Sequence, residues 1–229
     1  MNAAAARLDP ALLDKASEPY RASGRFAYGF ARGKLRRDPV FGAILARGLL
    51  TQRARILDLG CGQGLLAAWL LAAGSRARIR GIELEHRYVV RAQRAWGKYA
   101  AFETGDLRKT DFGSVDGIVI LDVLHYIEYA DQCNVLLRAR RALLVDGVLL
   151  LRVADGGGGW GFKLAKWVDQ TTLVLRGRGF RQLHYRSALQ WQRLLSDSGF
   201  DSEAVPMSRG TPFANVLMIA TPRSVVAPE

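Results

Sequence analysis

The sequence predicts an α/β domain in which helices lie on both faces of a mostly parallel sheet. Short apolar segments alternate along the chain with segments of helical periodicity, the pattern of such a sheet. A glycine-rich loop, Asp58–Gly64, joins the first apolar segment to the helix that follows it. The length of 229 residues suits one domain of this kind with a modest extension.

Residues 1–50 are predicted to form an N-terminal helical cover, and residues 51–229 the sheet-containing domain. Helices are expected at Ala11–Ala16, Gly24–Leu35 and Val40–Leu50. Asp9 and Pro10 suit the N-cap and first turn of the first helix, and Pro39 can open the last. The middle helix carries phenylalanines among arginines, a mixed apolar and basic face.

The sheet is predicted from buried strands that alternate with helices. The expected parallel strands are Arg55–Leu59, Ala77–Leu84, Ala101–Thr104, Gly117–Asp122 and Val148–Val153. The helices between them are expected at Leu65–Ala73, His86–Tyr99 and Ala130–Leu144, the last of them closed by Asp146 and Gly147. Two closing strands, Phe200–Val205 and Asn215–Thr221, complete the pattern, with Ser187 capping a helix over Ala188–Ser196 before them.

Four successive glycines, Gly156–Gly159, form the most conspicuous break in the chain. An amphipathic helix is expected after them at Phe162–Leu175. We interpret residues 155–186 as a hinged lid in which Trp160 offers an aromatic contact to a flat substrate. The alternative is an ordinary loop followed by a packed helix.

The loop Asp58–Gly64 has the features of a cofactor site. Its glycines, Gly60, Gly62 and Gly64, allow a sharp turn between strand and helix and a close approach of a ligand to the backbone. A dinucleotide site of the form G-x-G-x-x-G needs glycine at position 65, which is leucine here. The carboxylate of Asp58 suits a cationic amino-acid group better than a pyrophosphate. An NAD-binding protein is therefore disfavoured.

Two further acids follow the next two predicted strands. Glu83 ends the second strand, where a carboxylate can accept hydrogen bonds from both hydroxyls of a ribose. Asp106 follows the third strand and can accept from an adenine amino group. Taken alone, each acid is as compatible with a surface or turn position as with a role in ligand binding. Their occurrence in this order at successive strand ends predicts one ligand site at the carboxyl edge of the sheet.

These residues together resemble the class I S-adenosylmethionine-dependent methyltransferases, over about Arg53 to Thr221. Asp58–Gly64 matches the first motif of that family, Glu83 its ribose acid, Asp106 its adenine-side acid, and Asp116–His125 approximately its fourth motif. The resemblance implies a Rossmann-like sheet with an antiparallel last strand, S-adenosylmethionine as cofactor and S-adenosylhomocysteine as product. The cofactor-binding residues it implies are Asp58, Gly60, Cys61, Gly62, Gly64, Glu83, Leu84, Asp106, Leu107 and Asp122.

The segment after the fourth strand bears on the methyl acceptor. It lacks the Asn/Asp-Pro-Pro-aromatic sequence of enzymes that methylate base amino groups, and Cys133 follows glutamine rather than proline or threonine. Nucleic-acid substrates are thereby disfavoured. His125 can take a proton from an acceptor hydroxyl, or it can pack structurally or hydrogen-bond the cofactor. We expect O-methylation of a small molecule.

The acceptor is expected to contact Tyr28, Arg32, Tyr126 and Trp160, although Tyr28 and Arg32 also suit a solvated basic helix face. The N-terminal block is similar to stand-alone methyltransferases of aryl-polyene and polyketide-type pathways. That similarity implies an aromatic or polyenoic acyl acceptor held on an acidic acyl carrier protein, to which a chain of net charge +12 is complementary. An RNA methyltransferase and a non-catalytic cofactor-binding scaffold remain as alternatives.

The remaining features carry less information. The two cysteines, Cys61 and Cys133, lie in different apolar segments, so neither a disulfide nor a structural zinc site is expected. No metal is indicated. A membrane-spanning run and a secretory signal are absent from the sequence, and we expect a cytoplasmic protein.

Overall fold

The computed structural model describes residues 9–157, 182–208 and 214–223. The chain divides into two compact units. Unit 1 comprises Met1–Asp111 and Val115–Val119, and unit 2 comprises Phe112–Ser114 and Ile120–Glu229.

The strands are β1 (Arg55–Leu59), β2 (Arg78–Glu83), β3 (Ala101–Thr104), β4 (Val115–Leu121), β5 (Leu143–Ala154), β6 (Phe200–Pro206) and β7 (Asn215–Pro222). Their order in the sheet is β3-β2-β1-β4-β5-β7-β6. β1 and β3 each pair with β2 in parallel, whereas β7 is antiparallel to both β5 and β6. The predicted mostly parallel sheet with an antiparallel last strand is confirmed.

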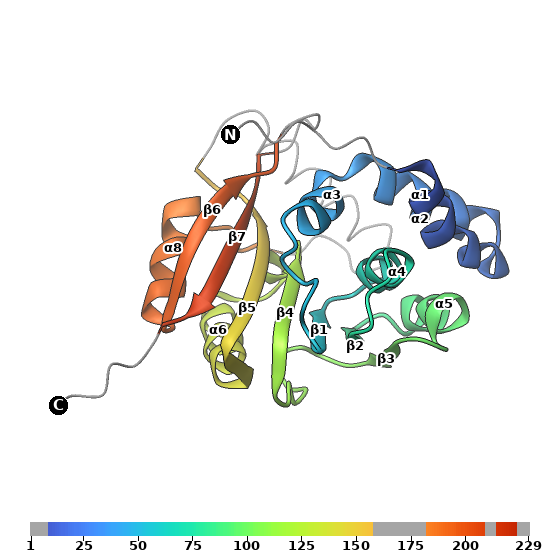
Figure 1. Cartoon of the computed structure of the whole chain (residues 1–229). Coiled ribbons are helices and arrows are strands. Elements are labelled where there is room, and N and C mark those ends of the chain that lie inside the picture. Colours follow the sequence, from blue (N-terminus) through green and yellow to red (C-terminus); the bar gives the residue numbers. More distant parts are fainter. Residues whose placement is uncertain (1–8, 158–181, 209–213, 224–229) are drawn as a thin grey trace. The chain divides into compact units, whose positions relative to one another are not determined.

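Unit 1 begins with the three predicted helices, here α1 (Pro10–Ser17), α2 (Arg25–Arg37) and α3 (Pro39–Ala46). A 3-10 helix that the sequence did not indicate, η1 (Glu18–Ser23), lies between α1 and α2. Two aspartates cap these helices; the sequence predicted the cap at Asp9, and the cap at Asp38 was not predicted. Asp9 accepts a hydrogen bond from the Ala11 N–H at 2.9 Å, and Asp38 accepts one from the Val40 N–H at 3.1 Å. α1, α2 and α3, blue in Figure 1, each pack against α4 (Leu65–Ala72).

Hydrogen bonds fasten the N-terminal helices along the length of α4. The Lys15 ammonium donates to the Ala72 carbonyl at 2.8 Å, at the C-terminal end of α4, where a cation also meets the negative end of the helix dipole. The Trp69 indole donates to the Phe41 carbonyl at 2.9 Å. At the other end of α4, the Tyr20 hydroxyl donates to the Gln63 carbonyl at 2.8 Å. The segment from α1 to η1 therefore runs from the C-terminus of α4 toward its N-terminus.

The strands of unit 1 meet their neighbours in a register that aligns the carboxyl ends. Asp58 lies opposite Gly81, and Glu83 lies opposite Thr104. A side chain at Gly81 would place its Cβ 2.7 Å from the Cys61 sulfur and 2.8 Å from the Phe102 ring, so only glycine fits there. α5 (His86–Trp96) follows β2 and packs against β2 and β3.

Unit 2 contains η2 (Leu124–Tyr126), α6 (Tyr129–Ala142) and α8 (Ala188–Asp197) beside its strands. Ser187 caps α8 in a capping box with Gln190, as its position predicts. The helix expected to end at Leu144 was predicted too long. Leu143 already has an extended backbone, at φ −76° and ψ 133°, and β5 begins there rather than at Val148. The apolar residues 143–145 suit a helix as well as a strand, which is why periodicity misplaced this boundary.

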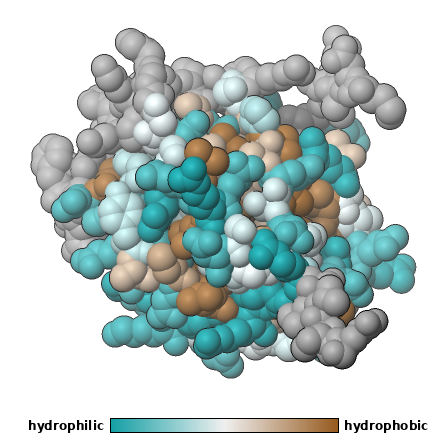
Figure 2. All heavy atoms as spheres, turned by 90° about the vertical axis from the view of Figure 1, so that its left-hand side faces the viewer, coloured by the Kyte–Doolittle hydropathy of each residue, from teal (hydrophilic) through white to brown (hydrophobic). Residues whose placement is uncertain are grey.

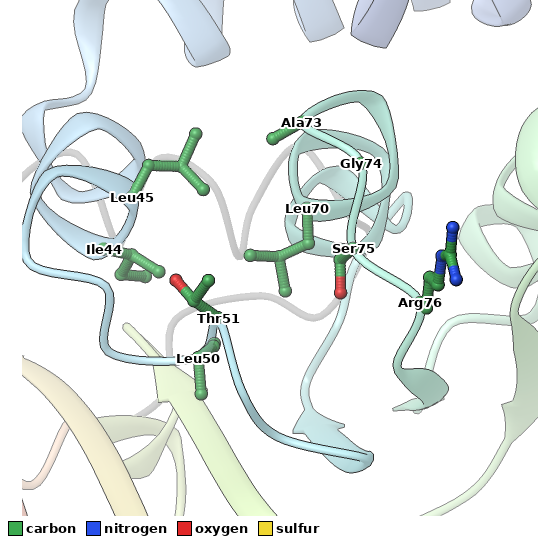
Figure 3. A pocket seen from close by; sticks show the side chains of 9 residues that line it. All are labelled: Ile44, Leu45, Leu50, Thr51, Leu70, Ala73, Gly74, Ser75 and Arg76. Carbon is green, nitrogen blue, oxygen red and sulfur yellow. The ribbon is translucent and has the colours of Figure 1, made fainter.

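A cavity of about 370 Å³ lies at the edge of unit 1 that carries the amino ends of β1 and β2. Its wall combines Ile44 and Leu45 of α3, Leu70 of α4 and the connecting residues Leu50 and Thr51 (Figure 3). Arg76, which precedes β2, extends away from these side chains. Because the glycine loop follows the carboxyl end of β1, this cavity belongs to the opposite edge.

The surface of unit 2 around α8 and β6 is largely hydrophilic, with hydrophobic residues in small separate groups (Figure 2). Across the part of the chain that the structure describes, no helix combines the length and the apolar character needed to cross a bilayer.

Candidate cofactor site

The glycine loop after β1 has a left-handed backbone at each of its three glycines. The φ angles are 78° at Gly60, 55° at Gly62 and 76° at Gly64, a region that glycine adopts without steric cost. The N–H groups of Gly60 and Cys61 both donate to the Ile82 carbonyl, at 2.7 and 3.0 Å. The loop is therefore tied to the end of β2.

Glu83, at the end of β2, is held by two backbone donors. The Gly62 N–H donates to one carboxylate oxygen at 3.0 Å, and the Glu85 N–H donates to the other at 2.9 Å. Each carboxylate oxygen has a second lone pair, so both can still accept a hydrogen bond from a ligand. The side chain is thus oriented in advance as a double acceptor.

Asp58 lies beneath the loop and is almost completely buried, with 4 % of its surface exposed. Burial, and next the negative charge of Glu83, raise the pKa of its carboxyl to about 7. A cationic ligand group near Asp58 would favour the ionised form. The prediction that this position suits a cationic amino-acid moiety is consistent with that environment.

Asp58 gives a pH-dependent expectation for ligand binding. With a pKa of about 7, roughly a tenth of the carboxyl is ionised at pH 6 and roughly nine-tenths at pH 8. If a cationic ligand binds the ionised form, the affinity for S-adenosylhomocysteine rises about tenfold over this range. Calorimetric titration at several pH values checks this. In Asp58→Asn the dependence should disappear; an unchanged dependence in that variant would show that another group titrates.

The raised pKa of Asp58 also makes the free energy of unfolding of the ligand-free chain depend on pH. An unfolded aspartate has a pKa of about 3.9. Between pH 4 and 7 the native state therefore retains a proton on Asp58 that the unfolded state releases. The free energy of unfolding consequently falls as the pH rises through this window.

Asp106 follows β3 and is engaged by a neighbouring arginine. Its carboxylate accepts hydrogen bonds from the Arg108 backbone N–H at 2.9 Å and from the Arg108 guanidinium at 2.6 to 3.0 Å. Hydrogen bonding to Arg108 lowers the pKa of Asp106. The Gly105 N–H donates to the Glu83 carbonyl at 3.0 Å, which ties the end of β3 to the end of β2. Leu107 is buried and Leu84 is half exposed.

The residues at this edge fit S-adenosylmethionine by their chemistry. A Cβ at Gly62 would meet no atom within 4 Å, whereas a Cβ at Gly64 would lie 2.8 Å from the Phe102 ring. The loop is therefore open at Gly62 and closed against the core at Gly64. Asp58, Glu83 and Asp106 provide carboxylates for a cation, hydroxyls and an amino group, and the structure brings all three to the carboxyl ends of β1, β2 and β3 in unit 1.

Sequence reasoning missed Tyr20 as part of this site. Its side chain is fully buried, and its hydroxyl donates to Gln63 within the glycine loop. Burial, followed by the charges of Cys61 and Asp58, raises the pKa of Tyr20 well above 10, so the hydroxyl remains a donor. The two hydrogen-bonded residues are 43 positions apart, and no local pattern in the sequence links them.

Tyr20→Phe is expected to weaken S-adenosylhomocysteine binding about fivefold, because the loop loses a buried hydrogen bond worth about 1 kcal/mol. Calorimetric titration measures the effect. Tyr99→Phe is the matched control, since Tyr99 is exposed and lies outside the loop. Equal affinities in the two variants would show that the Tyr20 hydroxyl does not support the loop.

In unit 2, Asp122 follows β4 with a φ of 58°, a left-handed conformation that is uncommon for residues other than glycine. Both of its carboxylate oxygens accept hydrogen bonds from the guanidinium of Arg152, at 2.9 Å for Nε. Arg152 is 2 % exposed. Arg152 is thus a structural partner of Asp122 that the sequence did not indicate. The contact of Asp122 with a cofactor stays a prediction.

His125 is buried in η2 among aromatic rings. Its ring stacks on Tyr185 with centroids 5.1 Å apart and an interplanar angle of 9°. The ring centroid of Tyr126 lies 4.1 Å from that of His125. The side-chain amide of Gln132 donates to the carbonyls of Leu124 and His184, at 3.0 and 2.8 Å. These contacts fix the turn that carries His125.

The other predicted substrate contacts are placed as follows. The Arg21 guanidinium lies 3.9 Å from the centre of the Tyr28 ring. Arg32 forms an ion pair with Asp14, which raises the pKa of the arginine. Trp160, the helix at Phe162–Leu175 and most of the lid at 155–186 lie outside the described residues. Contacts of Tyr28, Arg32 and Tyr126 with an acceptor therefore stay predictions.

Within the described ranges, no three histidine, cysteine, aspartate or glutamate side chains are grouped so that they could hold a metal ion. Cys61 and Cys133 are both free thiols. Burial raises the pKa of the Cys61 thiol, so its role in the loop is that of a small packed residue.

Comparison with known proteins agrees with this geometry. Residues 56–147 match a family model described as a methyltransferase domain. No curated protein matches the chain in sequence. Many solved structures share the fold, including the S-adenosylmethionine-dependent methyltransferase SibL, with 20 % identity and a TM-score of 0.67.

Two other similar structures were solved with ligands. Magnesium protoporphyrin IX methyltransferase from Synechocystis PCC 6803, with bound SAH, has 23 % identity and a TM-score of 0.62. Human N-acetylserotonin methyltransferase, in complex with SAM, has 18 % identity and a TM-score of 0.57. The alignment with SibL covers 87 % of this chain and 58 % of SibL. The alignment with the Synechocystis enzyme covers 90 % of this chain and 94 % of that enzyme. The alignment with the human enzyme covers 93 % of this chain and 66 % of that enzyme. At these identities the likeness establishes the Rossmann-like methyltransferase fold.

Proposed function

We propose that the chain is a class I S-adenosylmethionine-dependent methyltransferase and that it methylates an oxygen of a small aromatic or acyl acceptor. The observation that carries the cofactor assignment is the carboxylate of Glu83. Two backbone N–H groups hold it beside a glycine loop that is open at Gly62. A double acceptor fixed in this way suits the two hydroxyls of a ribose.

Each residue of the site has a proposed part in binding. S-adenosylmethionine, when bound, supplies a methyl group on a positively charged sulfur. Glu83 accepts from the ribose hydroxyls, and Asp58 in its ionised form attracts the cationic amino-acid end. Asp106 accepts from the adenine amino group, with Leu84 and Leu107 against the base. Gly60, Cys61, Gly62 and Gly64 line the approach of the ligand, and the cofactor contact of Asp122 stays a prediction.

His125 is proposed to accept the proton of the acceptor hydroxyl. Its burial among Tyr126 and Tyr185 equally suits a packing role, and the two roles predict different kinetics. For a proton acceptor, His125→Ala lowers kcat about 100-fold while S-adenosylhomocysteine affinity is unchanged. A loss of folding or of affinity together with kcat indicates packing instead. Transfer of a labelled methyl group and calorimetry measure the two quantities.

The acceptor is proposed to be aromatic or polyenoic and to be presented by an acidic carrier protein. The net charge of +12 supports an acidic partner. The test is transfer of labelled methyl from S-adenosylmethionine to a panel of phenols, free polyenoic acids and the same acyl groups on a carrier protein. Methylation of RNA in place of all of these contradicts the proposal. Cofactor binding without transfer to any acceptor or to RNA supports a non-catalytic scaffold.

A further inference from the structure

The outward face of α2 exposes two phenylalanines on one side of the helix. Ala27, Ala31 and Leu35, spaced four residues apart, form the buried stripe of this helix. Phe26 is 77 % exposed and Phe30 is 44 % exposed. Phe26 and Phe30 are four positions apart, so their side chains are neighbours on the helix surface. An exposed aromatic pair on a helix is a feature of interaction sites more than of solvated surfaces.

Cations without acidic partners surround this pair. α2 contains five basic residues and no acidic one. Lys34 is paired with Asp38, and Arg32 with Asp14. Arg25, Arg36 and Arg37 are exposed and have no carboxylate partner among the residues that the structure describes. At 3.6 residues per turn, Arg25 and Arg36 fall on one flank of the phenylalanine pair, and Arg37 falls between Phe26 and Phe30 in angle.

We propose that this α2 outer face, Arg25, Phe26, Phe30, Arg36 and Arg37, is the docking surface for an acidic helix of the carrier protein that presents the acceptor. The inference rests on the proposed function, because it assigns a place to the partner named there. The cations recognise carboxylates of the partner helix, and the phenylalanines cover its apolar positions. The net charge of +12 adds long-range attraction for the same partner.

The form of the face favours a protein over an anionic membrane. A helix that lies in a membrane presents a broad continuous apolar side. Here Gly29 and Gly33 separate the phenylalanines from Arg25 and Arg36, and a Cβ at either glycine would meet no atom within 4 Å. The apolar area is therefore narrow, and the open glycine positions admit the close approach of another helix. α2 has 13 residues, about 20 Å of helix, enough for one crossing partner helix.

The location of α2 connects this surface to the cofactor loop within unit 1. Gly24, at φ 95°, joins α2 directly to η1. Tyr20 of η1 donates its hydroxyl to Gln63 in the glycine loop. A partner on α2 is thus bound to the segment that contacts the loop. An interface of this size falls in the class of weak, transient contacts, so we expect a micromolar dissociation constant that increases with salt.

The experiment measures binding of the full-length chain to a purified, phosphopantetheinylated acyl carrier protein at low and at physiological ionic strength. Arg36→Glu/Arg37→Glu is compared with Arg94→Glu/Lys98→Glu, which makes the same charge change on an exposed part of α5 and its end. Phe26→Ser is compared with Tyr99→Ser, another exposed aromatic residue of unit 1. S-adenosylhomocysteine affinity is measured for every variant.

The expected result is at least a tenfold loss of carrier affinity in both α2 variants, less than a threefold loss in both controls, and unchanged S-adenosylhomocysteine affinity throughout. Equal losses in the two charge variants would show general attraction and overturn the proposal. So would wild-type carrier affinity in the α2 variants, absence of carrier binding by the wild type, or α2-dependent binding to phosphatidylglycerol vesicles in its place. Failure of the wild type to bind S-adenosylhomocysteine would instead overturn the proposed function.

Discussion

Replacing Glu83 by glutamine is expected to weaken S-adenosylhomocysteine binding about 100-fold. Two hydrogen bonds from ribose hydroxyls to a charged acceptor contribute about 3 kcal/mol together. The amide also has one oxygen where the carboxylate has two, and both carboxylate oxygens already accept from the backbone N–H groups of Gly62 and Glu85. The new NH2 group must therefore face a backbone donor, which disturbs the loop as well as the ligand contact.

Calorimetric titration of both proteins with S-adenosylhomocysteine measures this effect. Glu103→Gln is the matched control, since Glu103 is a partly exposed glutamate on the neighbouring strand β3 that pairs with Arg80. The control should bind with wild-type affinity. Near-ultraviolet circular dichroism shows whether Glu83→Gln retains its fold. A folded Glu83→Gln protein with less than a threefold loss of affinity would remove Glu83 from the ribose site.

The glycine loop was predictable because its information is local. Glycines at positions 60, 62 and 64 next to a strand end are visible in the sequence, and each has the left-handed backbone that only glycine adopts freely. Asp58 and Glu83 lie at neighbouring strand ends because parallel strands align their carboxyl ends, while their contacts with a cofactor stay predictions. Burial, and next the negative charge of Glu83, raises the pKa of Asp58, and the sequence does not show how deeply a side chain is buried.

The features that escaped prediction depend on contacts between distant residues. Tyr20 and Gln63 are 43 positions apart, and Asp122 and Arg152 are 30 positions apart. The periodicity of the segment around one residue of such a pair does not indicate which distant residue it contacts. Arg108 differs, because it lies two residues after Asp106 and its ion pair was within reach of local reasoning. The boundary between α6 and β5 failed for another reason, since its apolar residues fit both elements.

Asp122→Asn is expected to lower the free energy of unfolding by about 3 kcal/mol. Arg152 is a buried cation whose guanidinium donates to both oxygens of the Asp122 carboxylate. Removing the charged partner of a buried ion pair leaves the remaining charge without compensation, and this loss exceeds what the intact pair contributes to stability. Asparagine tolerates the φ of 58° at this position. The substitution thus changes the charge and keeps the backbone conformation accessible.

Urea unfolding measures the difference, and Asp201→Asn is its control. Asp201 pairs with Arg223 at 3.1 Å, also in unit 2, but both side chains are about half exposed or more. An exposed pair contributes no more than about 1 kcal/mol. If the two variants lose equal stability, burial does not strengthen the Asp122–Arg152 pair. Asp122→Ala adds the backbone effect, and we expect it to be about 1 kcal/mol less stable than Asp122→Asn because alanine disfavours a positive φ.

The size of this effect bears on how the chain uses Asp122. A left-handed aspartate at the end of β4, held by a buried arginine, is costly to maintain, and such positions concentrate at functional sites. If Asp122→Asn is destabilised but binds S-adenosylhomocysteine normally, the ion pair serves the fold of unit 2. If affinity also falls by tenfold or more in the folded protein, the pair orients Asp122 for the cofactor, as its position after the fourth strand predicts.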